Sequence, residues 1–161
     1  MRDRSCSRLL VIVATATACA SVPARSAPVQ LDSLSVERGA CYGTCDIYQL
    51  MVRRNGDLTL RKQSMEARLT YTSNDARRLL TSATDAGLLT LPARIRADSS
   101  LCPLEASDHS TVILTAYAPS RSSRVEHYTG CYLSHDLRVA PALERLVIFE
   151  RQLDALVAGK Y

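Results

Sequence analysis

Residue types that carry out chemistry gather around His127, which lies beside Tyr128 and four residues before Cys131. Asp108 precedes a predicted strand that would run next to His127. A cysteine thiolate, a histidine base and a carboxylate are the parts of a nucleophilic hydrolase. One interpretation is therefore a small hydrolase or metal-dependent enzyme centred on His127, with Asp108 and Tyr128.

That interpretation requires a free thiolate at Cys131, because a sulfur held in a disulfide cannot attack a substrate. The alternative is that His127 and Tyr128 pack and form hydrogen bonds beside a disulfide. The sequence also lacks a glycine-rich phosphate loop, a serine-centred elbow and an H-E-x-x-H motif. We favour a non-catalytic role, and we predict neither a cofactor nor a bound metal.

The N-terminus predicts export from the cell. Three arginines, Arg2, Arg4 and Arg8, precede a short apolar run from Leu9 to Ala18. A basic start followed by an apolar run too short to cross a bilayer is typical of a secretory signal peptide. We assign residues 1–18 to this signal.

Cys19 is a candidate lipidation site, because Ala16-Thr17-Ala18-Cys19 resembles a bacterial lipobox. The alternative is ordinary cleavage after Ala20, which also fits a small-residue rule. Residues 19–33 are rich in Ser, Pro and Ala and are interpreted as a tether. This favours a periplasmic or outer-membrane lipoprotein of a bacterium, anchored through Cys19, with one domain over residues 34–161.

Four cysteines remain after the leader is removed, namely Cys41, Cys45, Cys102 and Cys131. An even number in an oxidising compartment predicts two disulfides, for which three pairings exist. We favour Cys41–Cys45 with Cys102–Cys131, because the first closes a short loop and the second ties an irregular segment to a later strand. The longer loop predicts the larger stabilisation, about 3–4 kcal/mol in the chain-entropy model.

Two other uses of the cysteines remain as alternatives. A redox pair would normally show C-x-x-C beside a βαβ unit, whereas Cys41 and Cys45 are separated by three residues. A zinc site could combine these two with Cys131 and a histidine, but the second half of the usual ligand spacing is missing.

The charge of the chain does not indicate nucleic-acid binding. The full sequence carries 20 basic and 16 acidic residues, a net charge of +4. Cleavage before Cys19 would leave 17 basic and 15 acidic residues, a net charge of +2. The aromatic residues are not interleaved with Lys or Arg as in a nucleic-acid interface. With no Trp and one Phe, the core must consist mainly of aliphatic residues and tyrosine.

Alternating apolar and polar residues predict several short strands. These are residues 34–37, 46–53, 57–62, 67–71, 111–118 and 123–128. Asn55-Gly56 predicts a two-residue type I′ hairpin, because both residues tolerate positive φ. The stretch from Pro92 to Ser107 is expected to be irregular.

Two helices are predicted from caps and apolar periodicity. Thr72 and Asp75 resemble a capping box for a helix that reaches about Ala86, with Gly87 ending it. The second helix starts near Pro141 and continues to about Val157. The order of elements predicts an α+β fold, an antiparallel sheet of about five to six strands with both helices on one face.

Several motifs together resemble one family of exported bacterial domains, the domain of unknown function numbered six-four-three-eight. The matching stretches are Cys-Tyr-Gly-Thr-Cys-Asp-Ile-Tyr from Cys41, Asn-Gly-Asp-Leu from Asn55, Asp108 before a strand, and His-Tyr-Thr-Gly-Cys from His127. The family pattern has Phe where this chain has Tyr42, Pro at Asp46 and Thr at Ser107. The resemblance covers the chain from about Leu34 onward and implies export and the fold outline, with no activity attached.

The favoured hypothesis is an exported, disulfide-stapled envelope domain that binds a partner protein. Its predicted recognition surface is the sheet face left bare by the helices, with Gln49, Met51 and Arg53 exposed. The candidate binding residues are Tyr42, Asp108, His127 and Tyr128.

Overall fold

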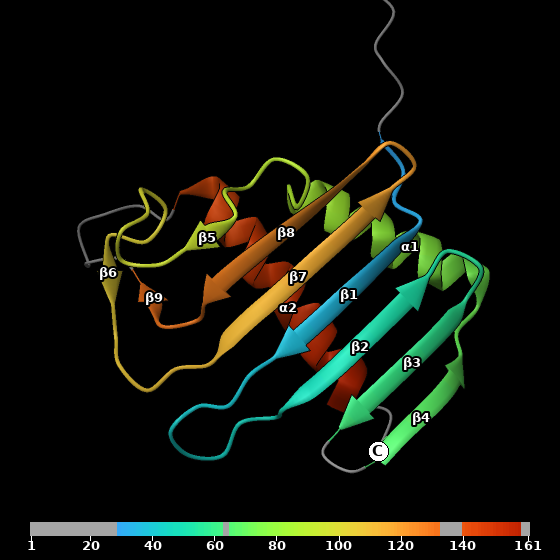
Figure 1. Cartoon of the computed structure of the whole chain (residues 1–161), viewed down its shortest axis with the longest axis horizontal. Coiled ribbons are helices and arrows are strands. Elements are labelled where there is room, and N and C mark those ends of the chain that lie inside the picture. The colour runs from blue at the N-terminus through green and yellow to red at the C-terminus, as the bar shows by residue number, and fades with distance from the viewer. Residues whose placement is uncertain (1–28, 63–64, 133–139, 159–161) are drawn as a thin grey trace, which may run out of the picture.

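The computed structural model describes residues 29–62, 65–132 and 140–158. Its main feature is a seven-stranded sheet with both helices on one face, which confirms the predicted α+β class (Figure 1). The strands are β1 (Ser33–Arg38), β2 (Tyr48–Arg53), β3 (Asp57–Lys62), β4 (Met65–Thr70), β5 (Arg94–Ile95), β6 (Leu104–Glu105), β7 (Thr111–Ala118), β8 (Arg121–Tyr128) and β9 (Cys131–Tyr132). The helices are α1 (Ser73–Asp85) and α2 (Pro141–Ala158).

The large sheet has the strand order β4-β3-β2-β1-β7-β8-β5. All of its pairings are antiparallel except that of β5 with β8. Alternate residues of each strand face the helices, as the period-two pattern predicts. Leu34 and Val36 of β1, for example, are fully buried, whereas Ser35 between them is only half-buried.

The hairpin between β2 and β3 differs from the predicted two-residue turn. Arg54, Asn55 and Gly56 separate the two strands, and only Gly56 takes a positive φ, of 102°. With a third residue in the loop, Asn55 keeps a negative φ and its side-chain oxygen accepts a hydrogen bond from the Asp57 amide (3.1 Å). The type I′ prediction was therefore wrong, and the loop matches the three-residue hairpin that ends in a left-handed glycine.

Helix α1 begins and ends where the sequence predicts. The Thr72 hydroxyl accepts a hydrogen bond from the Asp75 amide (3.1 Å), which satisfies one of the free N–H groups at the helix start. At the other end Gly87 takes a φ of 87°, the left-handed conformation typical of a helix terminus. The buried face consists of Ala76, Leu79, Leu80 and Ala83.

Helix α2 crosses behind the centre of the sheet (Figure 1). Its buried face is mainly apolar, as the periodicity of the sequence predicts, with Leu146, Phe149 and Leu153 almost completely buried. Glu150 lies within the same buried face, a position that was not predicted from the sequence. Helix α2 thus brings a carboxylate into contact with the inner face of the sheet.

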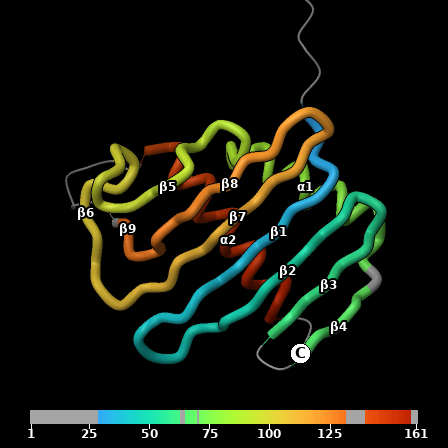
Figure 2. The backbone as a smooth tube through the Cα atoms, in the orientation of Figure 1, coloured from blue at the N-terminus to red at the C-terminus, as the bar shows by residue number. Residues whose placement is uncertain are grey.

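The segment from Pro92 to Ser107 is more ordered than expected. It contributes β5 to the edge of the large sheet and β6 to a second, two-stranded sheet with β9. Figure 2 shows this segment looping around the end of the sheet beside β8. The large sheet accordingly has seven strands, whereas about five to six were predicted.

Residues before the predicted boundary at 34 already take part in the core and the sheet, since Leu31 is buried and β1 starts at Ser33. The predicted signal peptide and Cys19 lie outside the described residues. Within the described ranges, no helix is both long and apolar enough to cross a membrane.

Candidate functional site

The loop between β1 and β2 presents an exposed aromatic side chain on a short disulfide. Cys41 and Cys45 form the first predicted bridge, with their Cα atoms 5.8 Å apart. Gly43 between them takes a φ of 119°, a conformation that a residue with a Cβ rarely adopts. The Tyr42 side chain is 87% exposed, the largest value among the exposed large hydrophobic side chains described.

This loop is held on both sides by contacts with the rest of the domain. The Tyr42 amide donates a hydrogen bond to the Asp108 carbonyl oxygen (3.2 Å). Asp46 forms an ion pair with Lys62 of β3 (2.6 Å between Oδ1 and Nζ). Two of the predicted binding residues, Tyr42 and Asp108, therefore meet, but through their backbones. The Asp108 side chain remains exposed and accepts a hydrogen bond from the Ser107 hydroxyl (3.1 Å).

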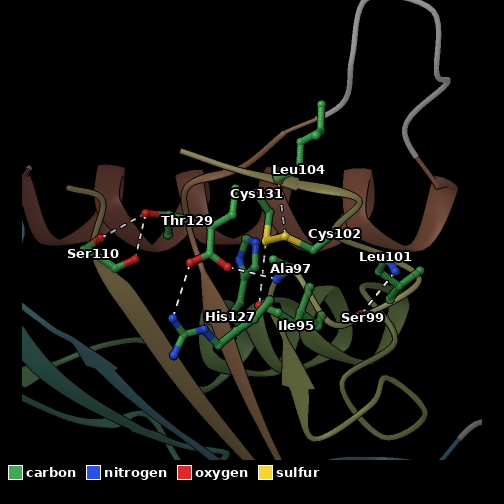
Figure 3. Close-up of a disulfide and its surroundings, with 12 residues drawn as sticks. Ile95, Ala97, Ser99, Leu101, Cys102, Leu104, Ser110, His127, Thr129 and Cys131 are labelled. Carbon is green, nitrogen blue, oxygen red and sulfur yellow. Dashed lines mark hydrogen bonds and ion pairs between the residues drawn. A yellow bond between two sulfur atoms is a disulfide. The ribbon is translucent and has the colours of Figure 1, made fainter. Parts of the chain in front are cut away.

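The second predicted disulfide, Cys102–Cys131, is also present, with a Cα separation of 5.2 Å. It joins the long segment before β6 to β9, and Cys102 is completely buried. The Cys131 sulfur lies 3.7 Å from the Ile95 carbonyl oxygen, and Ile95 is the strand partner of His127. The bridge therefore lies close to His127, as predicted (Figure 3).

His127 is buried beneath α2 and does not approach the Asp108 carboxylate in a hydrogen bond. Its side chain is 1% exposed, and its Nδ1 lies 2.8 Å from Glu150 Oε1. The Glu150 side chain is 5% exposed, so this is a buried polar pair. The Nε2 atom of His127 has no hydrogen-bond partner among the described residues. The acidic partner of His127 is thus Glu150, and the predicted candidate Asp108 is not.

Tyr128 follows His127 in β8 and projects to the opposite face, since consecutive residues of a strand alternate. Its hydroxyl accepts a hydrogen bond from the His109 amide (3.1 Å). The Arg96 guanidinium carbon lies 5.5 Å from the Tyr128 ring centre, within the range of a cation–π contact. The structure therefore does not bring the predicted group His127, Asp108 and Tyr128 together around one space.

A second, partly buried polar cluster lies on the inner face near the start of β2. Asp154 of α2 accepts hydrogen bonds from Arg38 Nε and from the Tyr48 hydroxyl, both at 2.9 Å. A second nitrogen of Arg38 pairs with the other oxygen of Asp154, and a third donates to the Ser110 hydroxyl (3.0 Å). The cluster thus ties α2 to β1 and β2.

The charges in this cluster shift two pKa values. Burial lowers the pKa of Arg38, but the Asp154 carboxylate and the Tyr48 phenol beside it together raise this pKa above its ordinary value. Burial, and then the negative charge of Asp154, raise the pKa of Tyr48. The arginine therefore stays charged and the phenol neutral across the physiological range, as the hydrogen bonds require.

Two of the acidic residues of α2, Glu150 and Asp154, contact the sheet, and neither contact was predicted from the sequence. Glu150 and Asp154 lie one helical turn apart, and Glu150 falls between Leu146 and Leu153 in the apolar periodicity of the helix. A charged residue inside an apolar stripe is the signal that would have indicated a buried partner. The partners of these two acidic residues, His127 and Arg38, lie on the strands on either side of β7, where Val112 is opposite both of them.

The sheet face opposite the helices is open and mostly polar. Gln49 and Arg53 are exposed there and Met51 is half-buried, close to the prediction for this surface. Tyr117 and Ile47 add two further exposed large side chains at or near this face. The face therefore offers several long, exposed side chains to a partner.

Among the described residues, no group of three His, Cys, Asp or Glu side chains lies close enough together to hold a metal ion. No protein-family model matches the chain. No curated protein matches it at a significant level either. The resemblance to the exported bacterial domain family therefore stays a prediction.

Proposed function

We propose that this domain is a non-catalytic binding module of the bacterial cell envelope. Its recognition site is the Cys41–Cys45 loop together with the adjacent open face of the sheet. The observation that carries this proposal is Tyr42, a large side chain that is 87% exposed on a loop closed by a disulfide.

Tyrosine is well suited to act as an anchor in a protein interface. It offers a large amphipathic contact area while losing little side-chain entropy, and it is enriched among residues that dominate binding energy. The loop that carries it is restrained by the disulfide, by the backbone hydrogen bond to Asp108 and by the Asp46–Lys62 ion pair. A restrained loop has less conformational entropy left to lose on binding, which favours affinity.

The cellular setting proposed for this module is the periplasmic side of the envelope. Two disulfides are compatible with an oxidising compartment. The basic and apolar N-terminus favours export, and Cys19 would carry the lipid anchor that holds the module at a membrane. The bound partner is proposed to be another envelope protein.

The decisive experiment is affinity capture from an envelope extract with the protein and two variants. Tyr42→Ala should lower recovery of the specific partner about tenfold or more, because it removes the anchor without touching the disulfide. Ile148→Ala is the matched control, since Ile148 is 54% exposed on α2, on the other side of the sheet. Equal recovery with all three proteins, or no discrete partner with any of them, would contradict the proposal.

Thiol titration separates this proposal from the hydrolase interpretation. A binding module with two structural disulfides should release no titratable thiol from Cys41, Cys45, Cys102 or Cys131 in the folded, exported protein. A reactive thiol at Cys131, combined with a turnover that a His127→Gln variant abolishes, would favour the hydrolase instead.

A further inference from the structure

Strand β4 forms an open edge of the large sheet. Among the strands that the structure describes, it pairs only with β3 and is the last in the order on that side (Figure 1). Its Glu66 and Arg68 side chains are exposed, and Met65 is 55% exposed. Open edges present unpaired N–H and C=O groups that can pair with another strand.

The backbone groups available at this edge follow from the pairing with β3. The Tyr71 amide donates to the Gly56 carbonyl (3.0 Å), and the strand partners continue as Leu58 with Leu69 and Leu60 with Ala67. Antiparallel ladders alternate between hydrogen-bonded and non-hydrogen-bonded pairs. Ala67 and Leu69 therefore direct their N–H and C=O groups towards β3. Glu66 and Arg68 direct theirs away from the sheet.

We propose that β4 pairs with β4 of a second copy of this chain, antiparallel about a two-fold axis at Ala67. Glu66 then lies opposite the partner's Arg68, and Arg68 opposite the partner's Glu66. The backbone groups of these same residues face outward, so each charged pair coincides with a hydrogen-bonded pair of the new ladder. The two seven-stranded sheets become one continuous sheet.

The sequence of β4 selects this register over the others. An axis at Glu66 or at Arg68 would place like charges opposite each other, which destabilises a sheet. With an axis at Met65 or Leu69, Glu66 would not lie opposite the partner's Arg68, so no pair of opposite charges would form. On the helix side, the proposed register sets Met65 against the partner's Leu69, so that the exposed methionine gains an apolar neighbour. A two-fold interface of this kind uses the same patch on both copies.

The charges also explain why this edge would select its own copy. Charged side chains on an edge strand discourage pairing with unrelated strands. The order Glu66, Ala67, Arg68 is complementary to itself only when the chain runs in the opposite direction. Glu66 also forms an ion pair with Arg61 of β3 (2.6 Å), which leaves its second oxygen available to the partner.

Sedimentation equilibrium of the purified protein over a range of concentrations tests the proposal. The protein should form a reversible dimer. Arg68→Glu places a glutamate opposite Glu66 at both symmetric positions of the interface. It should therefore raise the dimer dissociation constant about tenfold or more. Mixing Arg68→Glu with Glu66→Arg should restore a tight heterodimer, because every charged pair is then complementary. Arg53→Glu makes the same charge change on the open face of an interior strand and should leave the dimer unchanged.

A second variant tests the backbone part of the interface. Arg68→Pro removes an N–H that faces away from β3, a position where an edge strand tolerates proline. It should keep the circular dichroism spectrum of the native fold but remain monomeric. The proposal is overturned if the protein is monomeric at all concentrations. It is equally overturned if its dimer is insensitive to both Arg68 variants, or if the two charge variants do not form a heterodimer.

Discussion

Glu150 and His127 illustrate how a single residue pair can tie a helix to a sheet. Both side chains are almost completely removed from water, and their polar atoms meet at 2.8 Å. A buried polar group without a partner costs about 1–3 kcal/mol, so each residue requires the other. The pair therefore specifies how α2 sits on β8 at least as much as it adds stability.

The first prediction concerns the coupling of this pair. Glu150→Leu should lower the free energy of unfolding by about 3 kcal/mol, because it leaves His127 buried without its partner. Replacing both residues, as His127→Phe with Glu150→Leu, should recover a large part of that loss, since no polar atom is then left unpaired. Urea unfolding of the two single variants and the double variant measures the coupling. Additive effects would show that the two residues do not act as a pair.

Tyr48 supplies a prediction about pH. Burial, and then Asp154, raise its pKa above the ordinary value of about 10. Because the folded pKa is higher than the unfolded one, the stabilisation from the neutral phenol is complete below about pH 10 and is lost as the pH rises towards the folded pKa. Tyr48→Phe should cost about 1 kcal/mol near neutral pH, since it loses the hydrogen bond to Asp154.

The stability difference between the wild type and Tyr48→Phe should therefore shrink above about pH 10, because phenylalanine does not titrate. Denaturant titrations between neutral and alkaline pH measure this difference. Tyr117→Phe, at an exposed tyrosine of β7, is the control. A difference that stays constant with pH would contradict the assigned role of the hydrogen-bonded phenol.

At the scale of elements, two turns of similar backbone conformation should respond differently to the same substitution. Gly56 and Gly43 both take a positive φ, of 102° and 119°. A Cβ on Gly56 would lie 2.1 Å from the Tyr71 carbonyl oxygen, whereas a Cβ on Gly43 would meet no atom within 4 Å. The first glycine is needed for space and conformation, and the second for conformation alone.

Gly56→Ala should accordingly lower the free energy of unfolding by more than about 3 kcal/mol, because the β2–β3 hairpin must separate from the segment after β4. Gly43→Ala should cost only about 1–2 kcal/mol, the usual cost of a left-handed alanine. Thermal unfolding of the two variants compares them directly. Equal losses of stability in the two variants would mean that the close approach of Gly56 to Tyr71 does not determine the cost of a side chain at Gly56.

At the scale of the whole molecule, the two disulfides should differ in their contribution to stability. Cys102–Cys131 spans 29 residues, and Cys41–Cys45 spans four. In the chain-entropy model the longer loop contributes about 4 kcal/mol and the shorter about 2 kcal/mol. Replacing both cysteines of a pair by alanine should therefore destabilise the domain more at Cys102 and Cys131. The buried position of Cys102 adds to this effect.

Denaturant unfolding of the two double-alanine variants checks this order. Loss of the short bridge should in addition weaken partner capture, because the Tyr42 loop would regain conformational freedom. Larger destabilisation from removing the short bridge would contradict the entropic account of both disulfides.

Local patterns in the sequence were sufficient to predict most elements. The alternation in β7 and the Thr72 cap of α1 depend on neighbouring residues, so they could be recognised without the fold. The turn after β2 was predicted with the wrong geometry, because one additional loop residue changes the conformation that Asn55 must adopt. The short strands β5 and β6 were not predicted, since two residues carry no periodicity.

The sequence alone determined the class of the fold, which alternate residues of the strands face the core, and the favoured disulfides. Each of these depends on residue type and spacing. Only the tertiary structure decided that His127 meets Glu150 and that Asp108 contacts Tyr42 through the backbone. The partners of these residues are 23 and 66 positions away along the chain. Which of several distant carboxylates reaches a given histidine depends on how α2 crosses the sheet, and that crossing is set by packing of the whole core.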